Sequence, residues 1–148
     1  MPSAILLDTG PLGIVVHPRK HPDIKLWVQE SVRAGHTIVV PEIADYEIRR
    51  ELLRINATAS LSRLNALKAG VLYLPLTTSV MTRAAAFWAQ LRRTGVPTAI
   101  DAALDGDVIL AAQATLLAET GYTIVVATTN TKHIDRLAPS RLWHEIVP

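Results

Sequence analysis

Short hydrophobic runs alternate along the chain with longer segments in which hydrophobic residues recur at helical spacing. Four runs have the length of buried strands, and polar, Pro or Gly residues flank them. They are residues 4–7 (AILL), 37–40 (TIVV), 71–76 (VLYLPL) and 123–127 (TIVVA). Strands that are hydrophobic throughout are buried on both faces, so the pattern predicts a three-layer α/β/α sandwich with a mainly parallel central sheet.

The segments between these strands are predicted to be mostly helical. Their hydrophobic spacing and their capping residues give helices over residues 23–35, 43–55, 57–69, 80–94 and 107–120. Residues 9–13 (TGPLG) and 96–106 (VPTAIDAALDG) are expected to be loops, and the tail near Trp143 to hold a short helix and an edge strand. No repeat or low-complexity linker interrupts the chain, so we expect residues 1–148 to form one domain.

Polar side chains gather where the predicted strands end. In open parallel sheets, ligands bind outside the carboxyl ends of the strands. If the last long helix docks beside the first strand, its amino-terminal acids meet the residues at that edge. The candidates are Asp8 after the first strand, Glu42 and Glu47 after the second, Asn130 after the last, and Asp105 and Asp107 before the last long helix.

Acidic side chains that converge at such an edge favour a metal ion. Crowded, half-buried carboxylates raise one another's pKa unless a cation neutralises them. The chain has no cysteine, which excludes disulfides, thiolate chemistry and cysteine-based zinc sites. Oxygen ligands without a histidine pair at ligand spacing favour Mg²⁺ or Mn²⁺. Such an ion activates water against a phosphodiester, so the expected chemistry is hydrolysis of a nucleic-acid backbone.

Each candidate also has a structural interpretation. Asp105 suits a helix cap, and Asp107 suits an acid in the first helical turn, where it would interact favourably with the helix dipole. Asp8 and Asn130 are residue types that stabilise turns. By spacing alone, Glu47 is no better a metal ligand than three other acids near it, which are Glu42, Asp45 and Glu51.

Composition and charge change this picture little. The formal net charge of +2 is too small to indicate nucleic-acid binding, although residues 49–54 (RRELLR) form a local basic cluster. With one Phe, three Trp and three Tyr, the sequence predicts no aromatic-rich RNA platform. The chain shows no signal peptide and no hydrophobic run of about 20 residues, so we expect a cytoplasmic protein without membrane association.

Four motifs follow one another along the chain, and they are LLDTGPL, PEIADYEIRRELLR, DGDVILAAQA and VVATTNTKHI. In this order they resemble the PIN-domain ribonucleases, and most closely the VapC-type toxins of type II toxin–antitoxin pairs. The resemblance spans residue 4 to about residue 143 and implies a PIN-like nuclease domain. It implies a metal-dependent endoribonuclease that uses Mg²⁺ or Mn²⁺, cuts RNA, forms a homodimer and is inhibited by a cognate antitoxin.

The resemblance also selects residues. It implies catalytic roles for Asp8, Glu47, Asp107 and Asn130, with the metal held by Asp8, Glu47 and Asp107. Thr9, Asp105 and Thr128 take supporting roles, Asp105 as a helix cap or a residue behind the metal ligands. An Asn at position 130 gives a neutral oxygen, which favours a single resident ion. Arg50 and Arg54 are expected to contact RNA or the antitoxin.

A second function remains open on the sequence. A PIN-like module that binds RNA or protein without catalysis would keep the same hydrophobic pattern, because replacing one acid abolishes turnover without changing the fold. The Asp-Thr-Gly of residues 8–10 also matches aspartic proteases, but their mostly β fold disagrees with alternating strands and helices. Haloacid-dehalogenase phosphatases need a second Asp where this chain has Gly10.

Overall fold

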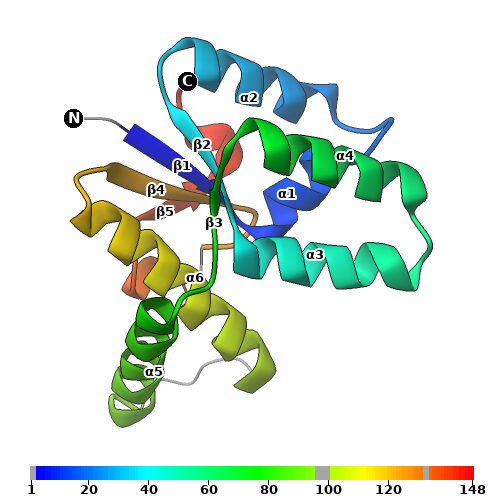
Figure 1. Ribbon diagram of the computed structural model, residues 1–148. Helices are drawn as coiled ribbons and strands as arrows, with labels where there is room; N and C mark the ends of the chain where they lie inside the picture. Colours follow the sequence, from blue (N-terminus) through cyan, green and yellow to red (C-terminus); the bar gives the residue numbers. More distant parts are fainter. Residues whose placement is uncertain (1–2, 96–100, 132–133) are drawn as a thin grey trace.

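The computed structural model describes residues 3–95, 101–131 and 134–148, without the side chains of residues 101–103 (Figure 1). Its centre is one sheet with the strand order β3-β2-β1-β4-β5, and all four strand pairings are parallel. The strands are β1 (Ser3–Leu7), β2 (Thr37–Pro41), β3 (Leu72–Leu74), β4 (Thr123–Thr128) and β5 (Ser140–Leu142).

The strands bury both faces, as their continuous hydrophobic runs require. Along β1, Ile5 and Leu7 pack on one side of the sheet, while Ala4 and Leu6 pack on the other. One side is covered by α1 (Thr9–Val15), α2 (Pro22–Arg33), α3 (Glu42–Arg54) and α4 (Thr58–Gly70). The other side is covered by α6 (Asp101–Glu119), and short 3₁₀ helices η1 (Ile134–Arg136) and η2 (Trp143–Glu145) lie near the carboxyl end (Figure 1).

The structure is compatible with the predicted α/β sandwich and its parallel sheet, whereas the PIN-like label of that prediction is corrected below; α5 (Thr78–Arg93) lies on the outer side of α6. The buried side chains of α5 pack mainly against α6, which faces the sheet with other residues. Because α6 is hydrophobic almost all round, it has a second face to bury, and α5 covers it. The residues in contact are Val80, Ala84 and Leu91 of α5 and Leu104, Val108 and Ala112 of α6.

Helix boundaries differ from the sequence prediction at two places. The helix α6 begins at Asp101, so Asp105 is an exposed residue inside the helix and the predicted cap at Asp105 is wrong. A glycine in a helix costs only about 1 kcal/mol, and burial of Leu104 beside Gly106 outweighs that cost. Residues 9–13, predicted as a loop, lie in α1, whose N-cap is Asp8.

One buried amide fixes α6 against the sheet. Gln113 is 2% exposed, and its Nε2 donates to the backbone oxygen of Leu74 at 2.8 Å. Its Oε1 accepts a longer hydrogen bond, 3.4 Å, from the backbone N–H of Ile43. These contacts connect α6 to the end of β3 and the start of α3. Within the described ranges, no helix, α6 included, combines the length and hydrophobicity needed to cross a membrane.

Candidate active site

Asp8 stands where β1 ends and α1 begins, at the carboxyl edge of the sheet. Its backbone N–H donates to Ala127 at 3.0 Å and so continues the pairing of β1 with β4. Oδ1 accepts a hydrogen bond from the backbone N–H of Thr9 at 2.7 Å, and Oδ2 accepts one from the hydroxyl of Thr128 at 2.8 Å. Both carboxylate oxygens are therefore held in place, and each keeps a further lone pair.

Glu47, 39 positions further along the chain, meets this edge from α3. The hydroxyl of Thr9 donates to Glu47 Oε1 at 3.1 Å, and Glu47 itself is half-buried. Burial, together with the negative charge of Asp8, raises the pKa of Glu47, against the opposing effects of Thr9 and Arg50. Asp8 and Glu47 thus form a pair of carboxylates that share one threonine and repel each other electrostatically.

The helix α6 passes close to this pair at Gly106. A Cβ atom built at Gly106 would lie 3.0 Å from Glu47 Oε2, which is tighter than ordinary van der Waals contact. Glycine at position 106 therefore allows α6 to pack closely against Glu47. The sequence prediction missed this contact because it took Gly106 as the end of a loop. Asp107, the next residue, is half-buried within α6.

The four predicted catalytic residues are not all brought together. Asn130 follows β4 as an exposed residue, and its backbone N–H donates to the hydroxyl of Thr128 at 3.0 Å. In the part of the chain that the structure describes, no three acidic or histidine side chains are close enough to hold one metal ion. Asp8 and Glu47, which Thr9 connects, are the two candidate ligands with a shared contact, and Asp107 directly follows Gly106, which packs against Glu47.

A cavity of about 250 Å³ opens next to Glu47. Its lining includes the carboxylate of Glu47 and the guanidinium of Arg50. This guanidinium lies 5.1 Å from the ring centre of Tyr46. Arg54 is not in this lining, and it forms an exposed ion pair with Glu51. The cavity is lined by Ile43, Tyr46, Glu47, Arg50, Asp105, Gly106 and Ile109.

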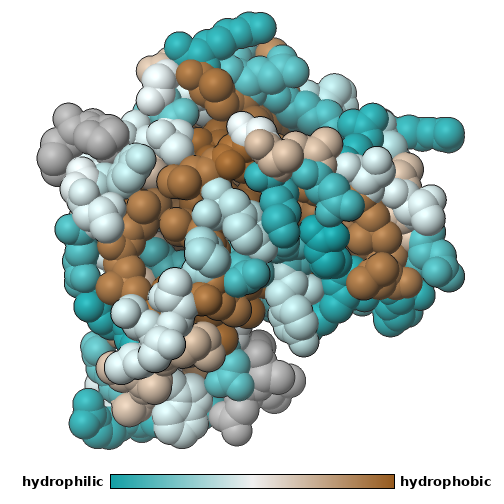
Figure 2. All heavy atoms as spheres, in the orientation of Figure 1, coloured by the Kyte–Doolittle hydropathy of each residue, from teal (hydrophilic) through white to brown (hydrophobic). Residues whose placement is uncertain are grey.

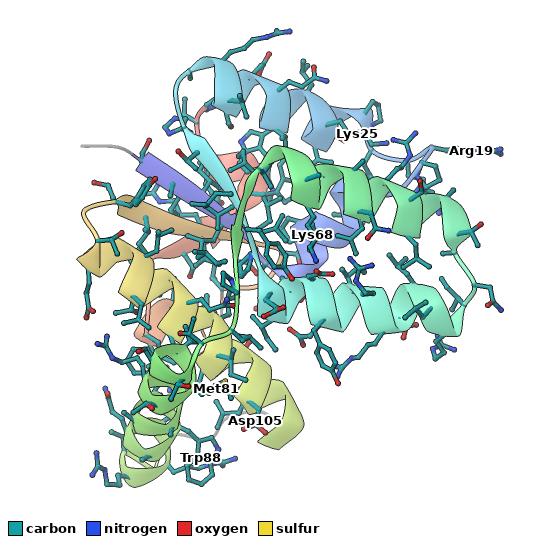
Figure 3. The ribbon with its side chains drawn as sticks, viewed as in Figure 1. Arg19, Lys25, Lys68, Met81, Trp88 and Asp105 are labelled. Atoms are coloured by element: carbon teal, nitrogen blue, oxygen red, sulfur yellow. The ribbon has the colours of Figure 1, made fainter. Side chains whose placement is uncertain are left out.

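Asp45, which spacing left as an equal candidate, has a different environment. It is 4% exposed, and it accepts hydrogen bonds from Arg49 Nε and from the hydroxyl of Tyr73, both at 2.8 Å. The Nζ of Lys68 on α4, a residue labelled in Figure 3, lies 3.6 Å from Asp45 Oδ2, the oxygen that also accepts from Tyr73. Burial would raise the pKa of Asp45, but these hydrogen bonds and cations hold it below its usual value. Asp45 is therefore a structural residue.

Comparison with known proteins gives structural likeness alone. No protein-family model matches the chain, and no curated protein sequence matches it significantly. VapBC2 from Rickettsia felis bound to a promoter DNA fragment has a TM-score of 0.73 at 17% identity, covering 95% of this chain and 98% of that one. FitAcB from Neisseria gonorrhoeae has 0.69 at 18%, covering 96% and 99%, and DNA-bound VapBC from Salmonella typhimurium has 0.65 at 17%, covering 97% and 99%.

These findings correct the family assignment made from the four motifs. At 17 and 18% identity the likeness establishes a fold shared with a chain of VapBC and FitAB complexes, and no family model places this chain in the PIN-domain group. The names of the neighbours identify complexes rather than single components. The chain is therefore not identified as a VapC-type PIN-domain ribonuclease, and the PIN-like label of the fold class is withdrawn with it.

Proposed function

We propose that this chain is a metal-dependent endoribonuclease that works within a toxin–antitoxin system. Its fold neighbours are toxin–antitoxin complexes, which supports the biological context. The observation that carries the activity is the pair of carboxylates Asp8 and Glu47, which come from different elements and share Thr9. Such a pair raises its own electrostatic energy, and a divalent cation relieves it.

The donor set suits one Mg²⁺ or Mn²⁺ ion. Asp8 and Glu47 would hold it, with Asp107 as a further carboxylate and Asn130 as a neutral oxygen donor. Two or three protein oxygens are enough for Mg²⁺, which keeps several waters. The bound ion would stabilise the negative charge that develops when a phosphodiester is hydrolysed.

The remaining residues would position this chemistry. Thr9 and Thr128 fix the orientation of the Asp8 carboxylate by donating to opposite oxygens. Thr9 also holds Glu47, so one residue sets the spacing of both acids. Arg50 lines the same cavity as Glu47 and would bind a phosphate oxygen of the RNA. The same guanidinium also suits an acidic group of an antitoxin, and Arg54 is the less suited of the two because Glu51 neutralises it.

The partner proteins are part of the proposal. An antitoxin that binds this chain would inhibit cleavage by covering the acid pair, and a second copy of the chain would form a homodimer. A binding protein without catalytic activity is the second candidate function, favoured by the finding that the described acids form no three-membered metal site. Both functions use the same fold, so only activity distinguishes them.

Cleavage of labelled RNA by the purified protein tests the activity. We expect cutting that appears with added Mg²⁺ or Mn²⁺, stops with EDTA, and is lost in Asp8→Ala and Asp107→Ala while both variants keep the fold, as circular dichroism would show. Asp23→Ala, which removes an exposed acid on α2, serves as the matched control. If Asp8→Ala cleaves RNA at the wild-type rate, the proposed active site is wrong. If the wild type cleaves no RNA with or without added metal, the result supports the binding protein without catalytic activity.

A further inference from the structure

A second hollow lies beside the Glu47 cavity, between α5 and α6. Its volume is about 390 Å³, and its lining includes Met81, Trp88 and Asp105, which Figure 3 labels on the facing parts of the two helices. In Figure 2, hydrophobic atoms reach the surface over α6 beside α5. Asp105 and Ile109 line both hollows, so the groove between α5 and α6 adjoins the cavity of the acid pair.

Each hollow is lined by an exposed aromatic ring that has an arginine four residues later on the same helix, and Arg50 itself lines the Glu47 cavity. Tyr46 on α3 is 55% exposed, and the guanidinium of Arg50 lies 5.1 Å from its ring centre. Trp88 on α5 is 38% exposed, and Arg92 lies 5.4 Å from its ring centre. A spacing of four residues keeps each pair on one helix face. The same arrangement thus occurs on both sides of the shared residue Asp105.

This arrangement fits unpaired nucleotides. A base of any type stacks on an aromatic ring, and a guanidinium beside the ring meets the phosphate of the same strand. Base pairs in a duplex keep their faces stacked on one another, so a duplex offers neither ring a base. Asp105 would repel phosphates and accept hydrogen bonds from base amino groups, which directs the backbone toward the arginines.

We propose that the pairs Tyr46–Arg50 and Trp88–Arg92 are two stacking subsites that bind single-stranded RNA, the first in the Glu47 cavity and the second at the adjoining groove between α5 and α6. The choice of RNA over another strand rests on the proposed function. The subsites themselves rest on exposure, on the two ring and guanidinium contacts, and on the continuity of the two hollows. A second copy of this chain seated on Met81 and Trp88 is the competing occupant.

Fluorescence anisotropy of a labelled single-stranded oligoribonucleotide, titrated in EDTA, measures binding without cleavage. We expect Trp88→Leu and Tyr46→Leu each to weaken binding about 10-fold, because each removes one stacking surface. Trp88→Phe and Tyr46→Phe keep a ring and are expected to restore most of the affinity. The same sequence annealed into a duplex is expected to bind more weakly and to be insensitive to both leucine variants.

Two control variants separate stacking from general surface effects. Leu26→Ala removes an equally exposed hydrophobic side chain on α2, and Arg33→Gln removes an exposed cation at the end of the same helix. Both are expected to bind the oligoribonucleotide as the wild type does. Arg50→Gln is expected to weaken binding and to reduce its dependence on salt concentration, because a phosphate contact is lost.

The possible outcomes distinguish this inference from the proposed function. Binding that depends on Trp88 and Tyr46 without any metal-dependent cleavage supports the subsites and rejects the nuclease. Metal-dependent cleavage with unchanged affinity in both leucine variants rejects the subsites and leaves the nuclease. If Trp88→Leu leaves RNA affinity unchanged but converts a dimer to a monomer in light scattering, the groove belongs to a second copy and the inference is wrong.

Discussion

Asp45 and Glu47 lie two residues apart on α3, yet their surroundings shift the pKa values of the two carboxyl groups in opposite directions. Asp45 is 4% exposed and receives two hydrogen bonds from Arg49 and Tyr73, with Lys68 close by. Its pKa is lowered by these partners. Glu47 is half-buried, meets another carboxylate at Asp8 through Thr9, and has a raised pKa.

The difference separates a structural acid from the candidate functional one. A buried carboxylate that the fold fully neutralises contributes to stability and has no capacity left for a ligand. A carboxylate placed beside a like charge keeps an electrostatic cost, and perturbed groups of this kind gather at functional sites. Because α3 turns by about 100° per residue, two residues are enough to send the side chains to different surroundings.

Replacing the functional acid gives the largest expected effect. Glu47→Gln removes one carboxylate oxygen of the proposed metal site but keeps the side-chain volume beside Gly106, so metal-dependent RNA cleavage should fall more than about 100-fold. The thermal unfolding temperature should stay the same or rise, because the repulsion from Asp8 disappears. Single-turnover cleavage and calorimetry measure the two effects. Glu51→Gln, an exposed acid one turn later, is the control, and equal losses in both variants would contradict the comparison.

Replacing the structural acid should reverse this pattern. Asp45→Asn removes the buried charge that Arg49 and Lys68 face, and because both cations keep contact with water, the free energy of unfolding should fall by about 2 kcal/mol. Cleavage by the folded fraction should stay within about two-fold of the wild type. Urea unfolding measures the first quantity, and a loss of cleavage with unchanged stability would place Asp45 in the active site instead.

Sequence patterns predicted the elements of the sheet better than the chemistry of its edge. Asp8 was predictable, because an acid directly after a buried strand must lie at the carboxyl edge of the sheet. The choice between Asp45 and Glu47 was not, since it depends on Tyr73 and Lys68, which come from other elements. The order of the motifs favoured Glu47 only through a resemblance to the PIN-domain ribonucleases, and the comparisons do not assign the chain to that family.

The path of α6 was also hidden from the sequence. Gly106 marked a loop end by local preference, but hydrophobic burial of Leu104 against α5 extends the helix back to Asp101. The stacking pairs were missed for a related reason. The small number of aromatic residues in the sequence gave no sign of them. The fold nevertheless brings Tyr46 and Trp88, which are 42 positions apart in the chain, to two hollows that share Asp105.

A moderate effect is expected where the acid pair is positioned rather than formed. Thr128→Val removes the hydroxyl that donates to Asp8 Oδ2 while keeping the shape of a buried side chain, so cleavage should fall about 10-fold. Thr128→Ser keeps the hydroxyl and should restore most of the rate. Thr115→Val on α6, whose hydroxyl donates only to a helix carbonyl, is the control. An unchanged Mn²⁺ requirement in Thr128→Val would argue against the positioning role.

The smallest expected effect is the pH dependence of stability, which should have opposite signs for the two acids. The lowered pKa of Asp45 stabilises the fold above the carboxyl's ordinary pKa of 3.8, and this contribution is lost as the pH falls through the folded-state value. The raised pKa of Glu47 does the reverse, because the folded state holds the proton more tightly than the unfolded state. Its contribution is fully present below 4.5 and is lost as the pH rises through the folded-state pKa. We expect this in the free energy of unfolding measured in EDTA. Asp45→Asn should be less stable than the wild type at pH 7 and approach the wild type near pH 3. Glu47→Gln should be slightly more stable than the wild type at pH 7 and lose that advantage below about pH 4. Differences of the same sign in both variants across this range would show that the two carboxylates do not differ in the way that their surroundings require.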